Sequence, residues 1–181
     1  MGTKTYVALL LMALFGVACG SSSTPAAATS HAAAPTSDAV TQTYVALVKG
    51  YWDGIVAADG VSGNFNEASL ACLGTINGSA PPRVDLVEPA NCRPHAIALL
   101  AVHDKFLGDL KGAIAPEQFG DDDKIFRSQV PRAVVAMKAL ILATATGKKQ
   151  AVFDASQAYV DIMLGSVVGA MDDVDPATRH Y

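Results

Sequence analysis

Residues 38 to 59 read DAVTQTYVALVKGYWDGIVAAD and keep one hydrophobic pattern from end to end. The apolar residues recur at steps of three and four, which is the spacing of one face of an α-helix. Thr36 or Ser37 stands where a helix N-cap is expected, and Asp38 complements the helix dipole in the first turn. The stretch therefore predicts an amphipathic helix that packs against other helices. Its apolar face is expected to carry Val40, Tyr44, Leu47, Val48, Tyr51, Trp52 and Ile55.

The same periodicity continues toward the C-terminus, and no alternating pattern of useful strand length interrupts it. Asn66 is expected to cap a short helix, Pro116 to end the next helix, and Pro131 to kink or split the one after it. The expected helices span residues 67–73, 94–115, 121–146 and 150–172. Together these elements predict an all-α fold, an antiparallel bundle of four long helices plus one short helix.

Each of the later helices has its own expected core face, defined by the same spacing. These faces carry Ile97, Leu100, His103, Phe106, Leu107, Leu110 and Ile114; Ile125, Phe126, Val130, Val134, Met137 and Ile141; and Phe153, Val160, Met163, Leu164, Val167 and Met171. Residues 38–181 have the length of one ordinary domain with a single core.

The N-terminus has the composition of an export signal. Lys4 precedes an uncharged apolar run at residues 6–18, and small polar residues follow it. The run is about 13 residues long, whereas a helix that spans a bilayer needs roughly 20. Residues 1–18 are therefore predicted to be a signal peptide that is removed.

The end of this run, Gly16-Val17-Ala18-Cys19, resembles the lipobox of bacterial lipoproteins. In that family the cysteine receives diacylglycerol and palmitate and becomes the mature N-terminus. The resemblance implies lipidation of Cys19 and anchoring to the cell membrane, outside the cytoplasm. Gly16 departs from the family pattern, because Leu is most common at that position. The alternative is ordinary cleavage without lipid, after which Cys19 is lost or remains a free thiol.

Residues 20–37 contain no charged side chain and no Phe, Trp or Tyr, a composition typical of a flexible tether. Such a stretch after the lipobox resembles lipoproteins of high-GC Gram-positive bacteria, in which the tether lifts the domain off the membrane. The predicted organisation is a signal peptide at 1–18, a lipidated tether at 19–37 and a helical domain at 38–181.

Residues 74–91 are rich in Gly, Pro and Asn and predict a long loop. Cys72 and Cys92 bracket this loop. In an exported protein, two remaining cysteines are most simply a disulfide, which would hold the loop closed.

Charge and motifs argue against several function classes. Without Lys4 the chain has 12 basic and 17 acidic residues, and this acidic balance gives no reason to expect nucleic-acid binding. The chain has no G-x-S-x-G, H-E-x-x-H, phosphate loop or haem-attachment motif. Neither Glu67, Glu88 nor Glu117 is followed by His three residues later, so di-iron chemistry is not expected. The sequence predicts no enzyme and no cofactor.

Four weaker patterns stay open as alternatives. The Cys92-x-x-His95 spacing, with Cys72 as a third ligand, is half of a zinc site. His95 and His103 on one side of a helix are a candidate pair of haem or copper ligands. The other two patterns are soft-ligand copper handling and calcium binding by acidic ends. They involve Met137, Met163, Met171 and His180, and the runs 121–124 and 172–175.

Two functional hypotheses follow. The favoured one is a non-catalytic interaction module that binds an envelope protein, a cell-wall component or a host surface through the disulfide-closed loop and the Tyr51-Trp52 region. The alternative is a small-ligand carrier for lipid, haem or metal, with space in the bundle left by small residues. Those small residues are Gly50, Gly54, Gly165 and Gly169.

Overall fold

The structure is a computed structural model that describes residues 36–62, 65–75 and 81–178. The predicted signal peptide, Cys19, all but the last two residues of the predicted tether, and His180 lie outside the described residues. None of the described helices is both long enough and apolar enough to cross a bilayer.

The helices are α1 (Ser37–Asp59), α2 (Glu67–Leu73), α3 (Pro89–Leu110), α4 (Gly120–Ala145), α5 (Lys149–Ile162) and α6 (Val168–Val174). The remaining elements are β1 (Val61–Ser62), β2 (Phe65–Asn66), the 3-10 turns η1 (Val84–Leu86), η2 (Glu117–Phe119) and η4 (Pro176–Thr178), and the π-helical turn η3 (Met163–Val167).

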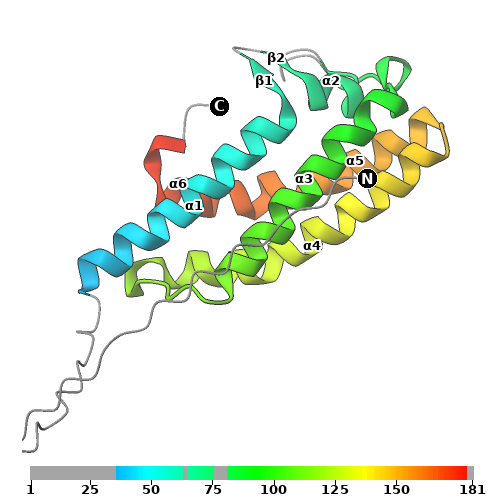
Figure 1. The fold of residues 1–181 in the computed structure, drawn as a ribbon. Helices are drawn as coiled ribbons and strands as arrows, with labels where there is room; N and C mark the ends of the chain where they lie inside the picture. The colour runs from blue at the N-terminus through cyan, green and yellow to red at the C-terminus, as the bar shows by residue number, and fades with distance from the viewer. Residues whose placement is uncertain (1–35, 63–64, 76–80, 179–181) are drawn as a thin grey trace, which may run out of the picture. The chain divides into compact units, whose positions relative to one another are not determined.

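Four long helical segments form the bundle, because η3 joins α5 and α6 into one segment (Figure 1). α1 packs mainly on α3, α3 on α4, α4 on α5 and α6, and α6 closes the ring against α1. Tyr51 of α1 contacts His103 of α3, and Ala58, which comes later in α1, contacts His95, which comes earlier in α3. The two helices therefore run antiparallel. The all-α bundle of four long helices plus one short helix is confirmed.

Two helix starts follow the predicted capping. The Thr36 hydroxyl accepts a hydrogen bond from the Ala39 amide at 3.3 Å, so Thr36 caps α1. The Asn66 side chain accepts from the Ser69 amide at 2.7 Å and caps α2. In both cases a short polar side chain satisfies a backbone donor that has no partner inside the helix.

The boundaries of α3 differ from the prediction at both ends. The helix begins at Pro89 rather than Pro94, because Pro89 occupies the first helical position, where a missing amide hydrogen costs nothing. Pro94 lies inside the helix. The helix also ends at Leu110 rather than Ala115, where backbone turns at Gly112 and Ala113 replace it. Ile114, expected in the core, is consequently 70% exposed.

Three further expectations were wrong. Of the two outcomes expected at Pro131, a kink or a split, the split did not occur, because α4 runs unbroken from Gly120 to Ala145 with the proline on its exposed side. Ile97 is 48% exposed and Leu164 is 69% exposed, although both were expected on buried faces. The short β1–β2 hairpin was also not predicted, since each strand is only two residues long and carries no readable alternation.

The disulfide between Cys72 and Cys92 is confirmed, and it ties α2 to the first turns of α3. The Glu88 amide donates to the Ala71 carbonyl at 2.8 Å beside it, and the Arg83 amide donates to the Leu73 carbonyl at 3.2 Å. Gly74 is required here. It has φ +62°, and a Cβ on it would stand 1.9 Å from the Arg83 carbonyl oxygen.

Removing this crosslink is expected to lower the free energy of unfolding by about 3 kcal/mol, because the loop of about 20 residues is no longer closed in the unfolded chain. The measurement is urea unfolding of residues 19–181 with Cys72→Ala and Cys92→Ala together. Cys19→Ser is the matched control and should leave the midpoint unchanged. A loss below about 1 kcal/mol would contradict the crosslink's expected role in stability.

Candidate functional site

A buried chain of three polar side chains links three helices in the middle of the bundle. His103 of α3 is fully buried. Its Nδ1 lies 2.7 Å from the Tyr51 hydroxyl of α1, and its Nε2 lies 3.1 Å from the Tyr159 hydroxyl of α5. The inward orientation expected for His103 is confirmed, and both of its nitrogens are occupied by tyrosines. It therefore has no lone pair to offer a haem or a copper ion in this arrangement.

The hydrogen-bonded side chains of Tyr51, His103 and Tyr159 are all electrically neutral at ordinary pH. Burial lowers the pKa of His103 to about 4, because desolvation disfavours the imidazolium. Burial also raises the pKa values of Tyr51 and Tyr159, so both remain phenols. A neutral imidazole donates through one nitrogen and accepts through the other. One tyrosine therefore donates a hydrogen bond to His103 and the other accepts one from it.

Aromatic packing fixes the position of this chain. The Tyr51 ring stacks on Phe106 with centroids 3.9 Å apart, and Phe106 meets Phe126 of α4 edge to face at 5.5 Å. Such contacts add to the energy of simple burial. Tyr51, proposed from the sequence as a surface contact, is thus mainly a core residue. Trp52 beside it is half-buried.

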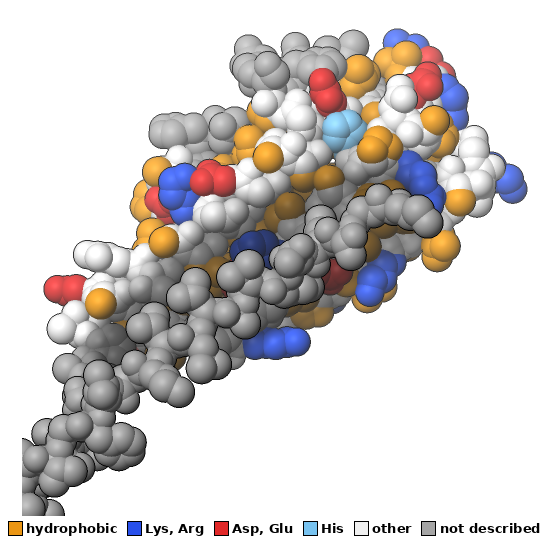
Figure 2. All heavy atoms as spheres, viewed as in Figure 1, with side chains coloured by type: hydrophobic (Ala, Val, Ile, Leu, Met, Phe, Trp, Pro, Cys, Tyr) orange, Lys and Arg blue, Asp and Glu red, His pale blue; other side chains and the backbone are white. Residues whose placement is uncertain are grey.

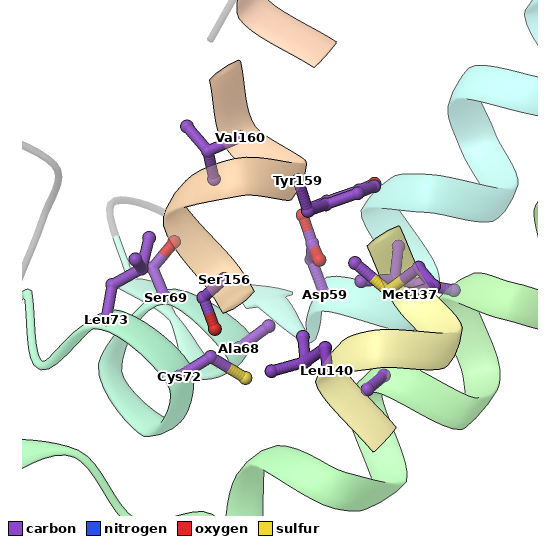
Figure 3. A pocket seen from close by; sticks show the side chains of 12 residues that line it. Asp59, Ala68, Ser69, Cys72, Leu73, Met137, Leu140, Ser156, Tyr159 and Val160 are labelled. Atoms are coloured by element: carbon purple, nitrogen blue, oxygen red, sulfur yellow. The ribbon is translucent and has the colours of Figure 1, made fainter. Parts of the chain in front are cut away.

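A small cavity of about 70 Å³ lies next to this chain, where the end of α1 meets α2 and α5. Figure 3 shows Asp59, Ser156 and Tyr159 around the cavity, with Met137 and Leu140 of α4 on the side opposite Ser69 and Leu73. Ligand pockets for drug-sized molecules measure about 300 to 1,000 Å³. The cavity holds water-sized molecules and is too small for a lipid or a haem.

Asp59 is the titratable group of the cavity. Desolvation raises the pKa of its carboxyl to about 6, while the Asn66 amide, at 3.4 Å, and the charge of His95 act in the opposite direction. The negative charge of Asp59 in turn helps to raise the pKa of Tyr159. Ser156 donates its hydroxyl proton to the Val152 carbonyl at 2.8 Å. The cavity thus combines one carboxylate with hydroxyls, and the Ser156 hydroxyl is bonded to a backbone carbonyl rather than to a base.

His95 is held by contacts within the protein. Its Nδ1 lies 2.8 Å from the Ala58 carbonyl, to which it donates, and its Nε2 is 3.9 Å from the Glu67 carboxylate. The zinc alternative fails here, because Cys72 and Cys92 are bonded to each other and offer no thiolate. Across the described residues, no three His, Cys, Asp or Glu side chains gather as metal ligands.

The other weak patterns also have structural explanations. Met137, Met163 and Met171 are buried in the core. Asp121 pairs with Lys124 at 2.7 Å, and Asp123 pairs with Arg127 at 2.6 Å. These contacts account for the methionines as core residues and for the acidic start of α4 as ion-pair partners.

The small residues expected to leave space inside the bundle do not do so. Gly165 and Gly169 are exposed, and so is Gly50, where a Cβ would meet nothing within 4 Å. Gly54 packs against Val102, whose methyl group would lie 3.0 Å from a Cβ. The expectation that these glycines leave internal space was therefore wrong, because Gly50, Gly165 and Gly169 lie on the outside of the bundle.

An apolar hollow lined by Gly50 and Gly54 lies between α1 and α3, and we name it the α1–α3 groove. It has a volume of about 390 Å³ and is lined by Thr43, Ala46, Leu47, Gly50, Tyr51, Gly54, Val102, Lys105, Phe106 and Asp109. A second hollow of about 220 Å³ shares Thr43 and Leu47 and continues toward Ala39 and Ile114. Hydrophobic side chains lie recessed between the two helices in Figure 2. Sequence analysis missed this groove, although Gly50 and Gly54 marked its floor.

Comparison with known proteins finds no matching family model, no similar curated protein and no similar solved structure at a significant level.

Asp59 and His103 give the folding stability opposite pH dependences. The folded-state pKa of Asp59, about 6, lies above its usual value of 3.8, so its stabilising contribution is present at low pH and lost as the pH rises through 6. The pKa of His103, about 4, lies below its usual value of 6.5, so its contribution is present above pH 6.5 and lost as the pH falls toward 4. Each shift corresponds to about 3 kcal/mol, and the two largely cancel.

Replacing Asp59 should expose the histidine effect alone. We expect Asp59→Asn to stabilise the protein at pH 7 by about 2 kcal/mol and then to lose about 3 kcal/mol between pH 7 and pH 4, whereas the unmodified protein changes little. Urea unfolding at pH 4, 5.5 and 7 measures both effects. Asp53→Asn, an exposed carboxylate on the same helix, is the control. Parallel pH profiles for Asp59→Asn and the unmodified protein would contradict the assignment.

Proposed function

We propose that this protein is a lipid-anchored, extracytoplasmic binding module without catalytic activity. It takes a helix of an envelope or host-surface protein into the α1–α3 groove. The anchor is the lipid expected on Cys19, and the cell membrane is the expected location. The single observation that carries the binding proposal is the groove itself, an apolar hollow of about 390 Å³ on the surface of the bundle.

The shape of the groove fits a helix. Together with the hollow that continues it, the groove follows α1 from Ala39 to Gly54. Fifteen residues of helix rise about 22 Å, which is the length of about four turns of a partner helix. The exposed Gly50 lowers the floor of the groove, so a partner backbone can approach α1 closely. Helices with apolar residues every three or four positions bind such grooves.

The rim of the groove supplies polar contacts. Lys105 and Asp109 form an ion pair at 2.5 Å along the α3 side, and Thr43 lies on the α1 side. Apolar floors with polar rims are typical of protein interfaces. The groove thus has the composition of a small interface.

The alternative function, carriage of a small ligand inside the bundle, has less support. Within the part of the chain that the structure describes, every buried side-chain nitrogen and oxygen has a hydrogen-bond partner. The cavity beside Asp59, at about 70 Å³, is too small for the lipid or haem that the carrier hypothesis named.

Filling the groove should abolish binding and leave the fold intact. A photo-crosslinking amino acid at Thr43, in full-length protein expressed in its host, should give one discrete protein adduct. Gly50→Trp should remove that adduct, because the indole occupies the groove where a Cβ meets nothing within 4 Å. Gly165→Trp, another open and exposed glycine, should keep it.

The thermal midpoint of Gly50→Trp should not fall, since Trp has a higher helix propensity than Gly. An adduct that persists in Gly50→Trp contradicts the groove as the binding site. An adduct with the mass of a lipid instead of a protein would favour the carrier function.

A further inference from the structure

The outward face of α4 combines exposed apolar side chains with cations. Pro131, Val135, Ala139 and Leu142 follow one another at steps of three and four, so they form one stripe along the helix. All four are exposed, Val135 at 67% and Leu142 at 71%. Nothing in the bundle covers this stripe. We name it the α4 stripe.

The charge around the α4 stripe has one sign. Residues 124–153 contain no Asp or Glu, yet they hold six of the thirteen Lys and Arg residues of a chain whose net charge is −4. Lys and Arg side chains lie beside hydrophobic ones at the lower right edge of Figure 2, where Figure 1 places α4. Four of these cations, Lys124, Arg127, Arg132 and Lys138, are on α4, and Lys148 and Lys149 stand at the start of α5.

The cations nearest the stripe form no ion pair within the part of the chain that the structure describes. Lys124, Arg127 and Lys149, at the two ends of the stretch, face Asp121, Asp123 and Glu88. Arg132, Lys138 and Lys148 form no ion pair with any described carboxylate, and Arg132 donates only to the Gln129 amide oxygen at 2.6 Å. Arg132 and Lys138 therefore stand next to stripe residues on α4, and Lys148 follows at the start of α5.

This combination points to a bilayer surface. A helix face that mixes exposed apolar residues with Lys and Arg binds in the plane of a membrane interface, where the cations meet anionic headgroups and the apolar residues enter the acyl boundary. We propose that the α4 stripe and its three unpaired cations are a docking surface for an anionic lipid bilayer, on which the domain lies with α4 down.

The arrangement of the helices determines which surface stays accessible when α4 lies on the membrane. α1 packs on α3 and α6, and α4 packs on α3, α5 and α6, so α1 and α4 lie across the bundle from each other. A domain that lies on α4 holds α1 on its upper side. The α1–α3 groove then remains open to a partner while the domain is on the membrane.

The predicted anchor is compatible with this orientation. Residues 19–35, between Cys19 and the start of the described domain, number 17, and a flexible chain of that length has a root-mean-square reach of about 23 Å. Tethering raises the local concentration of the domain at the bilayer, so a weak surface interaction suffices to hold it there. The inference extends the proposed function but does not depend on the partner groove.

The test uses residues 19–181 without lipid, which contain the whole compact unit of residues 35–181. Co-sedimentation is measured with vesicles of phosphatidylcholine containing 30% phosphatidylglycerol and with pure phosphatidylcholine. The chain should bind the anionic vesicles, should bind them less at 0.5 M than at 0.05 M NaCl, and should bind neutral vesicles poorly.

Variants then separate the α4 stripe from the overall charge. Arg132→Gln, Lys138→Gln and Lys148→Gln together should weaken binding on the order of a hundredfold, at about fivefold per cation. Lys49→Gln, Arg83→Gln and Lys111→Gln remove the same charge from α1, from the segment before η1 and from the end of α3, and should change binding less than fivefold. Val135→Ser with Leu142→Ser should also weaken binding, and these exposed positions leave the core intact.

Three outcomes would overturn the inference. The first is an unmodified chain that does not distinguish anionic from neutral vesicles. The second is a control triple variant as weak as the α4 triple variant. The third is a stripe that ignores vesicles and binds an acidic protein instead. Because no lipid anchor and no protein partner is present, failure here leaves the groove proposal standing, and failure of the Thr43 crosslink leaves this one standing.

Discussion

The burial of His103 between two tyrosines is the constraint on which the bundle depends. An imidazole in the core must satisfy both nitrogens, and here one partner comes from α1 and the other from α5. The three helices that meet at this residue can therefore adopt only one register relative to one another. A core made of aliphatic side chains alone would allow small slips, whereas each of these hydrogen bonds is lost if a helix shifts by one turn. The aromatic stack on Phe106 reinforces the same register from the α4 side through Phe126.

The two ends of the bundle are closed by different means. At one end the short α2, held by the disulfide and by Gly74, covers the core near the cavity beside Asp59. At the other end the Tyr44 hydroxyl donates to Asp123 at 3.0 Å, and Arg127 pairs with the same carboxylate. This second closure is a partly buried hydrogen bond and ion pair, because Tyr44 is buried and the Asp123 side chain is only 14% exposed. The long faces between the ends hold the groove along α1 and the stripe along α4, which are the two surfaces proposed for binding.

The sequence alone predicted the fold class, α1, α2 with its Asn66 cap, the inward His103 and the disulfide. These features depend on local patterns, namely helical spacing, capping residues and a cysteine pair. The errors arose where tertiary packing overrides such patterns. Ile97 and Leu164 fit the helical period, but their neighbours do not cover them. The partners of His103 could not be predicted, because Tyr51 and Tyr159 are 52 and 56 residues away and only the packed bundle brings them together. The α4 stripe was missed because Val135 and Leu142 lie outside the core face predicted for that helix, and exposed apolar residues are no signal by themselves.

The π-helical turn at Met163–Val167 joins α5 and α6 into one continuous segment. Ser156 and Tyr159 are buried before it, Met163 and Val167 within it, and Ala170 and Val174 after it, so the buried positions continue at steps of three and four. A π turn holds one more residue than an α turn, so the segment carries one residue more here than a regular helix of the same length. Leu164 lies in this turn and is 69% exposed. The turn therefore widens the helix without moving its buried side out of the core, and α6 still packs against α1.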